Sequence, residues 1–246
     1  MTDPFAQARV HFDVFRMDDR PYELSNDVDA LLSAGIRILA PDERITLPAE
    51  LYVCGADFPV PADAAIRHRL ESAVQWRSVV AEAGFPKSDP CMDYLAGAIY
   101  SACDIAGDDG LVVDRTSGII VSAAKLRDLD ENTEVRDTVV IAKQAGGGAI
   151  TLTTHGLVKY GQREIVAEIA SDVEDALCGY LYNNVFPNIV RGHTVFPGET
   201  LQNMNPPFRL AFIPEETRLR MVDAPDEPRS DLQLLAEAIR RTVGRS

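Results

Sequence analysis

The sequence predicts an α+β fold, in which one or two mixed or mostly antiparallel sheets are packed by four to five helices. Two observations carry this prediction: apolar runs of strand type occur in consecutive pairs, and helical patterns do not alternate with them regularly, as they would in a doubly wound sheet. A chain of 246 residues with 46% hydrophobic residues is also able to bury a sizeable core.

The first half opens with a strand over residues 10–14, followed by a short helix. Apolar residues of the strand alternate with His11 and Asp13, a period of two that predicts a polar side facing water. Polar residues begin the helix predicted over residues 25–34, and Gly35 ends it. Short apolar runs bounded by turn residues predict further strands over 36–39, 51–54, 111–114 and 119–121.

The longest helix predicted from the sequence covers residues 62–83. Apolar residues recur in steps of three and four and form one stripe: Ile66, Leu70, Ala73, Trp76, Val80 and Ala83. A second helix is expected from Asp89 to Ala106, because Asp89 can cap it and Pro90 suits the first helical position. Cys103 falls on its apolar face.

A polar stretch over residues 128–137 divides the chain into an N-terminal half, 1–130, and a C-terminal half, 138–246. The two halves are predicted either as separate domains or as one continuous domain. The second half begins with a hairpin, in which strands over 138–143 and 149–154 flank a turn of three glycines, Gly146 to Gly148.

A strand over 163–169 and a helix follow the hairpin. Ser171 and Glu174 are spaced as a capping box for this helix, which is expected to bury Leu177 and to end near Pro187. Closing strands are predicted over 194–196, 208–213 and 219–222. The spacing of Ser230 and Gln233 indicates the start of a last helix.

The charge of the chain limits its partners. With 24 Lys and Arg against 38 Asp and Glu, the net charge is −14, which disfavours nucleic acid because phosphate binding needs an excess of cations. No run of 18 apolar residues suggests a membrane helix, and the N-terminus lacks the pattern of a signal peptide. We therefore expect a cytoplasmic protein with no membrane association, and the sequence leaves its oligomeric state open.

No cofactor or metal is expected. The four cysteines have no Cys-x-x-Cys spacing, and the glycine triplet precedes a strand, so it offers no helix N-terminus to a phosphate. Asp108 and Asp109 are the weak metal candidates, but acidic residues do not stand at the positions that a calcium loop requires. A turn at Asp108, Asp109 and Gly110 accounts for them.

The residues best suited to chemistry lie between residues 153 and 194. His155 and His193, with Glu164 or Glu168, could supply a general base and the carboxylate that orients it. The alternative is a hairpin in which His155 and Tyr160 pack across strands while Lys159 and Arg163 face water, and this alternative is favoured. Residues suited to contacting a partner are Lys159, Tyr160 and Arg163.

One segment resembles a group of uncharacterised bacterial proteins that share a domain of unknown function. The shared pattern is Thr, any residue, Gly, Leu, two variable residues, an aromatic residue, Gly, two variable residues, an acidic and an aliphatic residue, here from Thr154 to Ile165. The resemblance covers about residues 150–200 and departs at Gln162 and Arg163, where leucine and proline are commoner. It implies an intracellular bacterial α+β protein and transfers no catalytic residue.

The sequence is compatible with two functions. The first is an acidic binding protein of the immunity, inhibitor or adaptor type, whose charge steers it toward a basic protein partner. The second is a hydrolase or transferase with a pocket around His155 and His193. We favour binding over catalysis, because groups suited to catalysis are scattered whereas the negative charge belongs to the whole chain.

Overall fold

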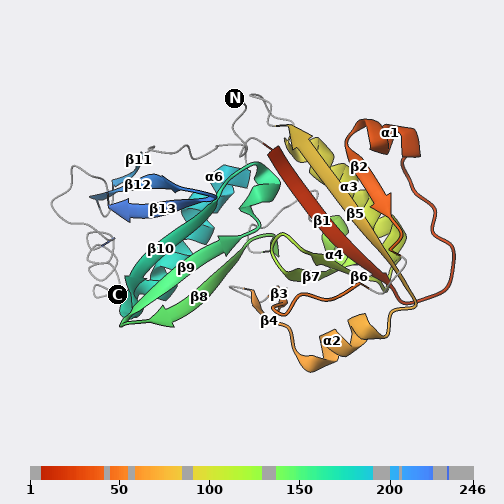
Figure 1. The fold of residues 1–246 in the computed structure, drawn as a ribbon, viewed down its shortest axis with the longest axis horizontal. Helices are drawn as coiled ribbons and strands as arrows, with labels where there is room; N and C mark the ends of the chain where they lie inside the picture. The colour runs from red at the N-terminus through yellow and green to blue at the C-terminus, as the bar shows by residue number, and fades with distance from the viewer. Residues whose placement is uncertain are drawn as a thin grey trace. The chain divides into compact units, whose positions relative to one another are not determined.

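A computed structural model describes residues 7–41, 45–54, 59–84, 91–128, 137–190, 200–204, 207–223 and 232. The chain forms two compact units (Figure 1). Unit 1 comprises Met1–Val140 and Val158–Gly161, and unit 2 comprises Ile141–Leu157 and Gln162–Ser246. Each unit has one sheet that mixes antiparallel and parallel pairs, so the predicted α+β class is confirmed. Nothing in the sequence pattern predicts that Val158–Gly161 returns to unit 1.

The sheet of unit 1 has seven strands in the order β2-β5-β1-β6-β7-β3-β4. Its strands are β1 (Gln7–Arg16), β2 (Ile36–Leu39), β3 (Tyr52–Val53), β4 (Val60–Pro61), β5 (Gln75–Gly84), β6 (Leu111–Asp114) and β7 (Ile119–Ser122). All neighbours pair antiparallel except β3 and β7, which are parallel. The strands expected over 36–39 and 111–114 have the predicted bounds.

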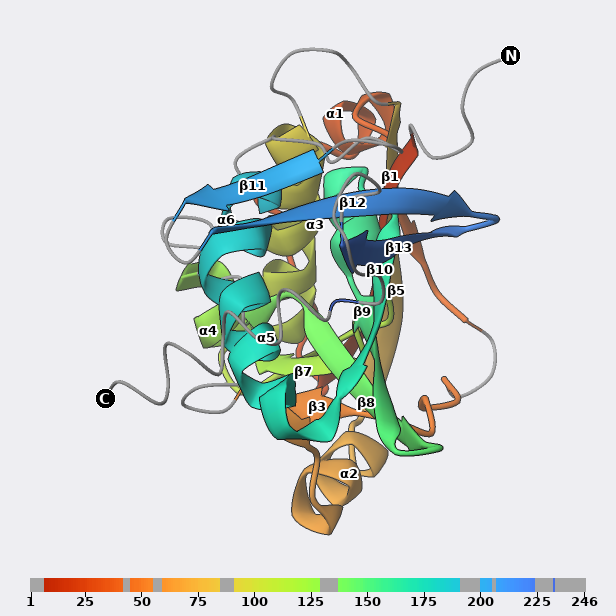
Figure 2. The ribbon, with the colours of Figure 1, turned by 90° about the vertical axis from the view of Figure 1, so that its left-hand side faces the viewer.

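One face of this sheet is covered by α3 (Cys91–Ala106), as Figures 1 and 2 show for β1 and β5. Arg16 donates from Nη1 to the carbonyl of Ile105 at 3.0 Å, so the even-numbered positions of β1 face this helix. The helix predicted from Asp89 is confirmed over Cys91–Ala106, whereas its first two residues lie outside the described part of the chain. Cys103 is buried, as expected from the apolar stripe.

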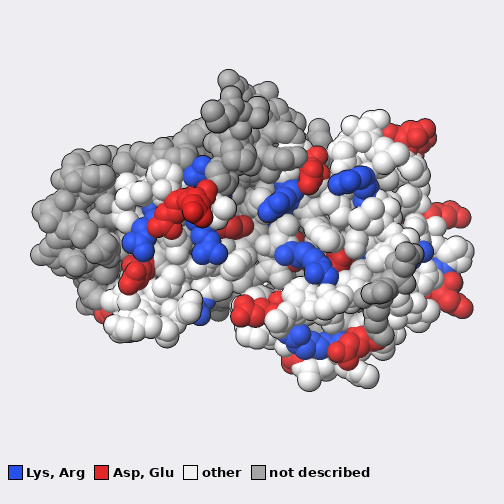
Figure 3. Space-filling model, viewed as in Figure 1, with Lys and Arg blue, Asp and Glu red and all other residues white. Residues whose placement is uncertain are grey.

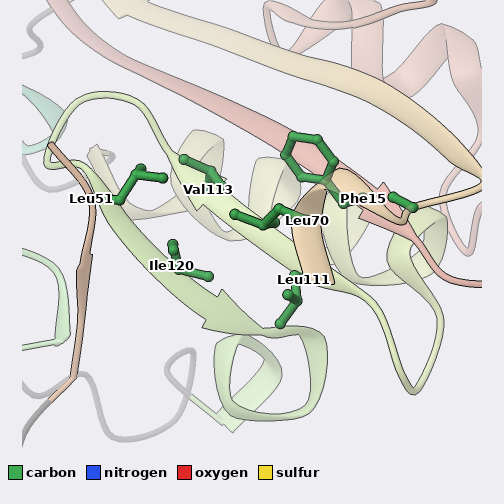
Figure 4. Packing of buried hydrophobic residues seen from close by; sticks show 7 residues of the cluster. Phe15, Leu51, Leu70, Leu111, Val113 and Ile120 are labelled. Carbon is green, nitrogen blue, oxygen red and sulfur yellow. The ribbon is translucent and has the colours of Figure 1, made fainter. Parts of the chain in front are cut away.

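The opposite face of the sheet is covered at one end only. There α2 (Ala64–Glu71) places Leu70 against Phe15 of β1, together with Leu111, Val113, Ile120 and Leu51 (Figure 4). Asp63 caps α2, because its carboxylate accepts a hydrogen bond from the Ile66 amide at 2.9 Å. Two further helices complete unit 1, α1 (Val28–Ser33) and α4 (Ala123–Asp128).

The helix predicted over residues 62–83 is wrong in its second half. The helix ends at Glu71, and residues from Gln75 onward form β5, which lies between β2 and β1. Val79 and Ala81 are buried whereas Glu82 is exposed, so this segment follows the period of a strand. The adjacent β-branched Val79 and Val80 favour a strand, and apolar residues three and four apart fit both periods over so short a run.

The sheet of unit 2 has six strands in the order β11-β12-β13-β10-β9-β8. They are β8 (Val140–Gly146), β9 (Ala149–His155), β10 (Glu164–Ala170), β11 (Thr200–Met204), β12 (Pro207–Glu215) and β13 (Arg218–Asp223), and β10 runs parallel to β13. The predicted hairpin is confirmed. Gly147 and Gly148 form its turn with φ of 60° and 88°, a left-handed conformation that favours glycine.

A continuous helical run follows β10 after a 3-10 turn, η3 (Ser171–Val173). It consists of α5 (Glu174–Tyr180), a π-helical segment η4 (Leu181–Val185) and α6 (Phe186–Val190). If this run is counted as one helix, the described residues contain five, which agrees with the four to five predicted. The buried side expected at Leu177 is confirmed.

Two details of this helix differ from the prediction. The residue that caps α5 is Val173, which makes no side-chain hydrogen bond to the helix, so no capping box begins α5. The helix also continues past Pro187 to Val190. The wider π turn directly before Pro187 changes the hydrogen-bond register, which lets the chain accommodate a residue without an amide proton.

Two predicted elements, the strand over 194–196 and the helix starting at Ser230, lie outside the described residues. Within the described part of the chain, no helix combines the length and the apolar composition needed to cross a bilayer.

Candidate functional site

The catalytic candidates fall in unit 2, where β9 pairs with β10. His155 ends β9 and Glu164 begins β10, and the antiparallel register brings these strand ends together. The Glu164 carboxylate accepts hydrogen bonds from Thr154 Oγ1 at 2.7 Å and from the Gly156 amide at 2.8 Å. Gly156 has a φ of 109°, so Glu164 holds a turn of the chain. His193 lies outside the described residues, and the pairing of His155 with His193 stays a prediction.

Lys159, expected to face water, is buried in unit 1. Its side chain is 2% exposed and its ammonium group donates to the Asp114 carboxylate and to the carbonyl of Thr138. Tyr160 is buried beside it and donates to Thr138 Oγ1 at 2.9 Å. Both residues belong to a 3-10 turn, η2 (Leu157–Tyr160), which turns them into the core of unit 1 instead of extending the hairpin.

Asp114 is the centre of this buried cluster. Besides Lys159, its carboxylate accepts from the Thr116 amide at 2.8 Å, from Thr116 Oγ1 at 2.5 Å and from Ser117 Oγ at 2.9 Å. Tyr94 of α3 donates to the carbonyl of Lys159. The cluster therefore fastens the Val158–Gly161 segment to β6 and α3, and it leaves Lys159 and Tyr160 buried and unsuited to contact a partner directly. Arg163, the third partner candidate, directly precedes β10 in the sequence of unit 2 and is half-buried.

Asp13, expected on the wet side of β1, is also buried. Its carboxylate accepts from Ser78 Oγ at 2.8 Å, from His11 Nε2 at 3.1 Å and from Arg115 Nε. Burial is the largest single influence and alone would raise the pKa of Asp13. The hydrogen bonds from His11, Arg115 and Ser78 together outweigh it and hold that pKa below its usual value. Asp13 is therefore buried with its carboxylate hydrogen-bonded, although the alternation along β1 predicts that it faces water.

The weak metal candidates lie on the surface. Asp108 and Asp109 are exposed in the turn between α3 and β6, and the carbonyl of Asp109 accepts from Arg69 at 2.7 Å. In the described ranges, no group of three or more His, Cys, Asp or Glu side chains could hold a metal ion.

The described thiols are poorly ionised. Burial, together with the nearby Asp137 carboxylate, raises the pKa of Cys54 to about 12, and burial raises the pKa of Cys103 and Cys178 to about 11. Because the thiolate is the reactive form, we expect iodoacetamide at pH 8 to modify these three residues about a hundredfold more slowly in the folded protein than in urea. Peptide mass spectrometry after short labelling pulses measures this, and labelling of Cys54 at its unfolded rate would contradict it.

Carboxylates gather on one surface of unit 1, where all are exposed except the half-buried Asp18 and Asp104. Ser25 donates its amide to Asp104, and the Asp108 and Asp109 charges act on Arg20, so the chain after β1 and the end of α3 form one surface. We call it the acidic face, and its residues are Asp18, Asp19, Glu23, Asp27, Asp29, Asp104, Asp108 and Asp109.

Positive charge compensates this face in part. Arg16 donates to the carbonyl of Ile105 at the C-terminal end of α3, the negative end of the helix dipole, and Arg69 donates to the carbonyl of Asp109, whereas the last turn of α3 itself contains no basic residue. Arg16 and Arg20 both bond Asp18, and hydrogen bonds from Arg20 and then Arg16 lower the pKa of Asp18 to about 2. The two arginines are thus committed to one carboxylate, and the remaining acidic residues add their charges to the surface.

The acidic face also contains apolar side chains. Val28 and Leu32 of α1 are 57% and 55% exposed, and they stand four residues apart on one side of the helix. Asp27 and Asp29 flank Val28 in the sequence. Carboxylates around exposed aliphatic residues form a surface suited to a partner that carries both positive and apolar side chains.

No family model matches the chain, and neither curated proteins nor solved structures give a match. The resemblance of residues 150–200 to a bacterial group therefore stays a prediction.

The acidic face and both buried carboxylate clusters were not predicted from the sequence. The face was detectable in part, because acidic residues crowd positions 18–29 and 104–109 of the sequence. The pairing of Asp114 with Lys159 had no such signal, since 45 residues separate the two in the chain.

Proposed function

We propose that this protein is a binding protein whose acidic face engages a basic protein partner. The observation that carries the proposal is the series of exposed carboxylates along residues 19–29 and at Asp108 and Asp109, with Val28 and Leu32 exposed beside Asp27 and Asp29. Charge of one sign on one surface speeds association with an oppositely charged partner and helps to orient it.

The distribution of charge between the units supports the same function. Unit 1 contains 25 Asp and Glu against 14 Lys and Arg, a net charge of −11, whereas unit 2 contributes the remaining −3. The acidity of the chain is therefore mostly a property of unit 1, the unit that carries the acidic face. A cytoplasmic location accords with this function, since Cys54, Cys103 and Cys178 are free thiols.

Catalysis around His155 has less support. The Glu164 carboxylate is engaged with Thr154 and Gly156, where it shapes the chain. The favoured function is therefore an adaptor or inhibitor that acts by occupying a partner, without changing it chemically.

The proposal is tested by neutralising the face. We compare the wild-type chain with a triple variant, Asp19→Asn, Asp108→Asn and Asp109→Asn, as immobilised baits at low salt. The matched control is Glu71→Gln, Glu168→Gln and Glu216→Gln, which removes the same charge from exposed positions outside the face. Retained proteins are identified by mass spectrometry.

We expect the wild type and the control to retain the same basic proteins, which are released as salt rises, because the Debye length falls to about 8 Å at 0.15 M salt. The face variant should retain about tenfold less of them. Equal retention by all three baits, or retention that salt does not weaken, would refute the proposal.

A further inference from the structure

The uncovered part of the unit 1 sheet carries a cluster of positive charge. In antiparallel strands, residues directly opposite each other point to the same face. The register of β1 with β5 and of β5 with β2 places His11, Val80 and Arg37 in one row across three strands. The next row along β1 pairs Arg9 with Glu82. These side chains share the face that α3 does not cover.

This part of the face is open to solvent. The cluster around Phe15 and Leu70 covers only the end of the face near α2. Beyond it Arg9 and Arg37 are exposed, and Leu39 of β2 is 47% exposed on the same face. Figure 3 views the sheet from this side, with β1 and β5 in front of α3, and shows Lys and Arg side chains over these strands with an acidic side chain between them.

The two arginines of this face make no ion pair with a described carboxylate, although Glu82 stands opposite Arg9 on β5. Among the described residues, neither Arg9 nor Arg37 has an ion pair or a hydrogen bond from its guanidinium group. Other cations of the unit, such as Arg16, Lys125 and Lys159, each bond a carboxylate. In a unit with a net charge of −11, two unpaired guanidinium groups on one open face are available for an external anion.

We propose that this face, which we call the arginine patch (Arg9, His11, Arg37, Leu39 and Val80), binds an acidic segment of a partner protein. Guanidinium groups bind carboxylates through two parallel hydrogen bonds, and Arg37 and Arg9 can each engage one carboxylate of the segment. Val80 and Leu39 lie beside them and contact its apolar side chains, a mixture of arginine and aliphatic surface that is typical of protein interfaces.

A protein segment fits the patch better than a nucleic acid does. The net charge of −14 repels a polyphosphate at long range, and the patch contains no Phe, Tyr or Trp on which bases could stack. A short acidic segment carries fewer charges and also uses the aliphatic residues. The patch is separate from the acidic face, so together they would let one unit bind a basic and an acidic partner.

The probe is a fluorescent peptide of four glutamates alternating with four valines, and fluorescence anisotropy measures its binding to the full chain. A peptide with glutamine in place of glutamate and a single-stranded oligonucleotide of eight nucleotides are the competing ligands. The test variant is Arg9→Gln with Arg37→Gln. The control is Arg127→Gln with Arg218→Gln, which removes two exposed arginines from other positions.

We expect the glutamate peptide to bind the wild type and the control, and to bind the test variant at least about tenfold more weakly. The glutamine peptide and the oligonucleotide should bind weakly to all three. The proposal would be overturned if the wild type did not bind the peptide, or if the test variant bound it as tightly as the wild type. It would also be overturned if the control lost peptide binding or if the oligonucleotide bound more tightly than the peptide. Circular dichroism verifies that both variants fold. Sedimentation shows whether the bound species contains one copy of the chain. Peptide binding that appears only in a dimer would assign the patch to self-association.

Discussion

Replacing Lys159 by methionine is expected to destabilise unit 1 by about 3–5 kcal/mol, because it removes one partner of a buried ion pair. The Lys159 side chain is 2% exposed and bonds Asp114, which is itself buried. Methionine retains the length of the side chain but leaves the Asp114 carboxylate without its cation. Hydrogen bonds from Thr116 and Ser117 remain and do not replace the lost charge.

Urea unfolding followed by tryptophan fluorescence measures this loss. The chain has one tryptophan, Trp76, which packs against the Leu70 cluster of unit 1, so the signal reports on this unit. Arg127→Met, at an exposed position, should change the free energy of unfolding by less than about 0.5 kcal/mol. The double variant Asp114→Asn with Lys159→Met should be less destabilised than the sum of its single variants. A Lys159→Met protein as stable as the wild type would show that the pair is not buried.

Asp13→Asn is expected to cost about 2–3 kcal/mol at pH 7, because hydrogen bonds to a buried charged group are lost or weakened. Arg115, His11 and Ser78 all bond this carboxylate. Since the pKa of Asp13 is lowered in the folded protein, its stabilising contribution is fully present above the unfolded pKa of about 3.9 and is lost as pH falls through the folded value.

The pH dependence distinguishes this carboxylate from the others. The difference in unfolding free energy between the wild type and Asp13→Asn should be largest near pH 7 and should shrink below about pH 4. Asp19→Asn is the control, since Asp19 is exposed. A difference that stays constant from pH 7 to pH 3 would mean that the Asp13 charge does not stabilise the fold.

Elements with a single clear period were predictable from the sequence. The strands over 36–39 and 111–114, the helix that ends at Ala106 and the glycine hairpin all follow local patterns, and the structure confirms them. Residues 75–84 failed because their apolar residues fit a helix as well as a strand. Pairing with β1 and β2, which no local pattern contains, determines that they form β5.

The buried charges were not predictable for a related reason. Alternation along β1 assigns Asp13 to water, and only the positions of Ser78 on β5 and of Arg115 in the turn after β6 make its burial favourable. Lys159 is placed by a return of the chain into unit 1. The acidity that suggested a binding function was visible in the composition and in the first half of the sequence, whereas the proximity of residues 18–25 to the end of α3 required the fold.

The most direct test of the binding function locates the contact itself. A carbodiimide joins a carboxylate to a lysine that touches it, and mass spectrometry identifies the joined residues in a complex captured at low salt. The acidic face predicts cross-links from partner lysines to Asp19, Glu23, Asp108 or Asp109. Cross-links confined to unit 2, for example at Glu215 and Glu216, would contradict binding through the acidic face.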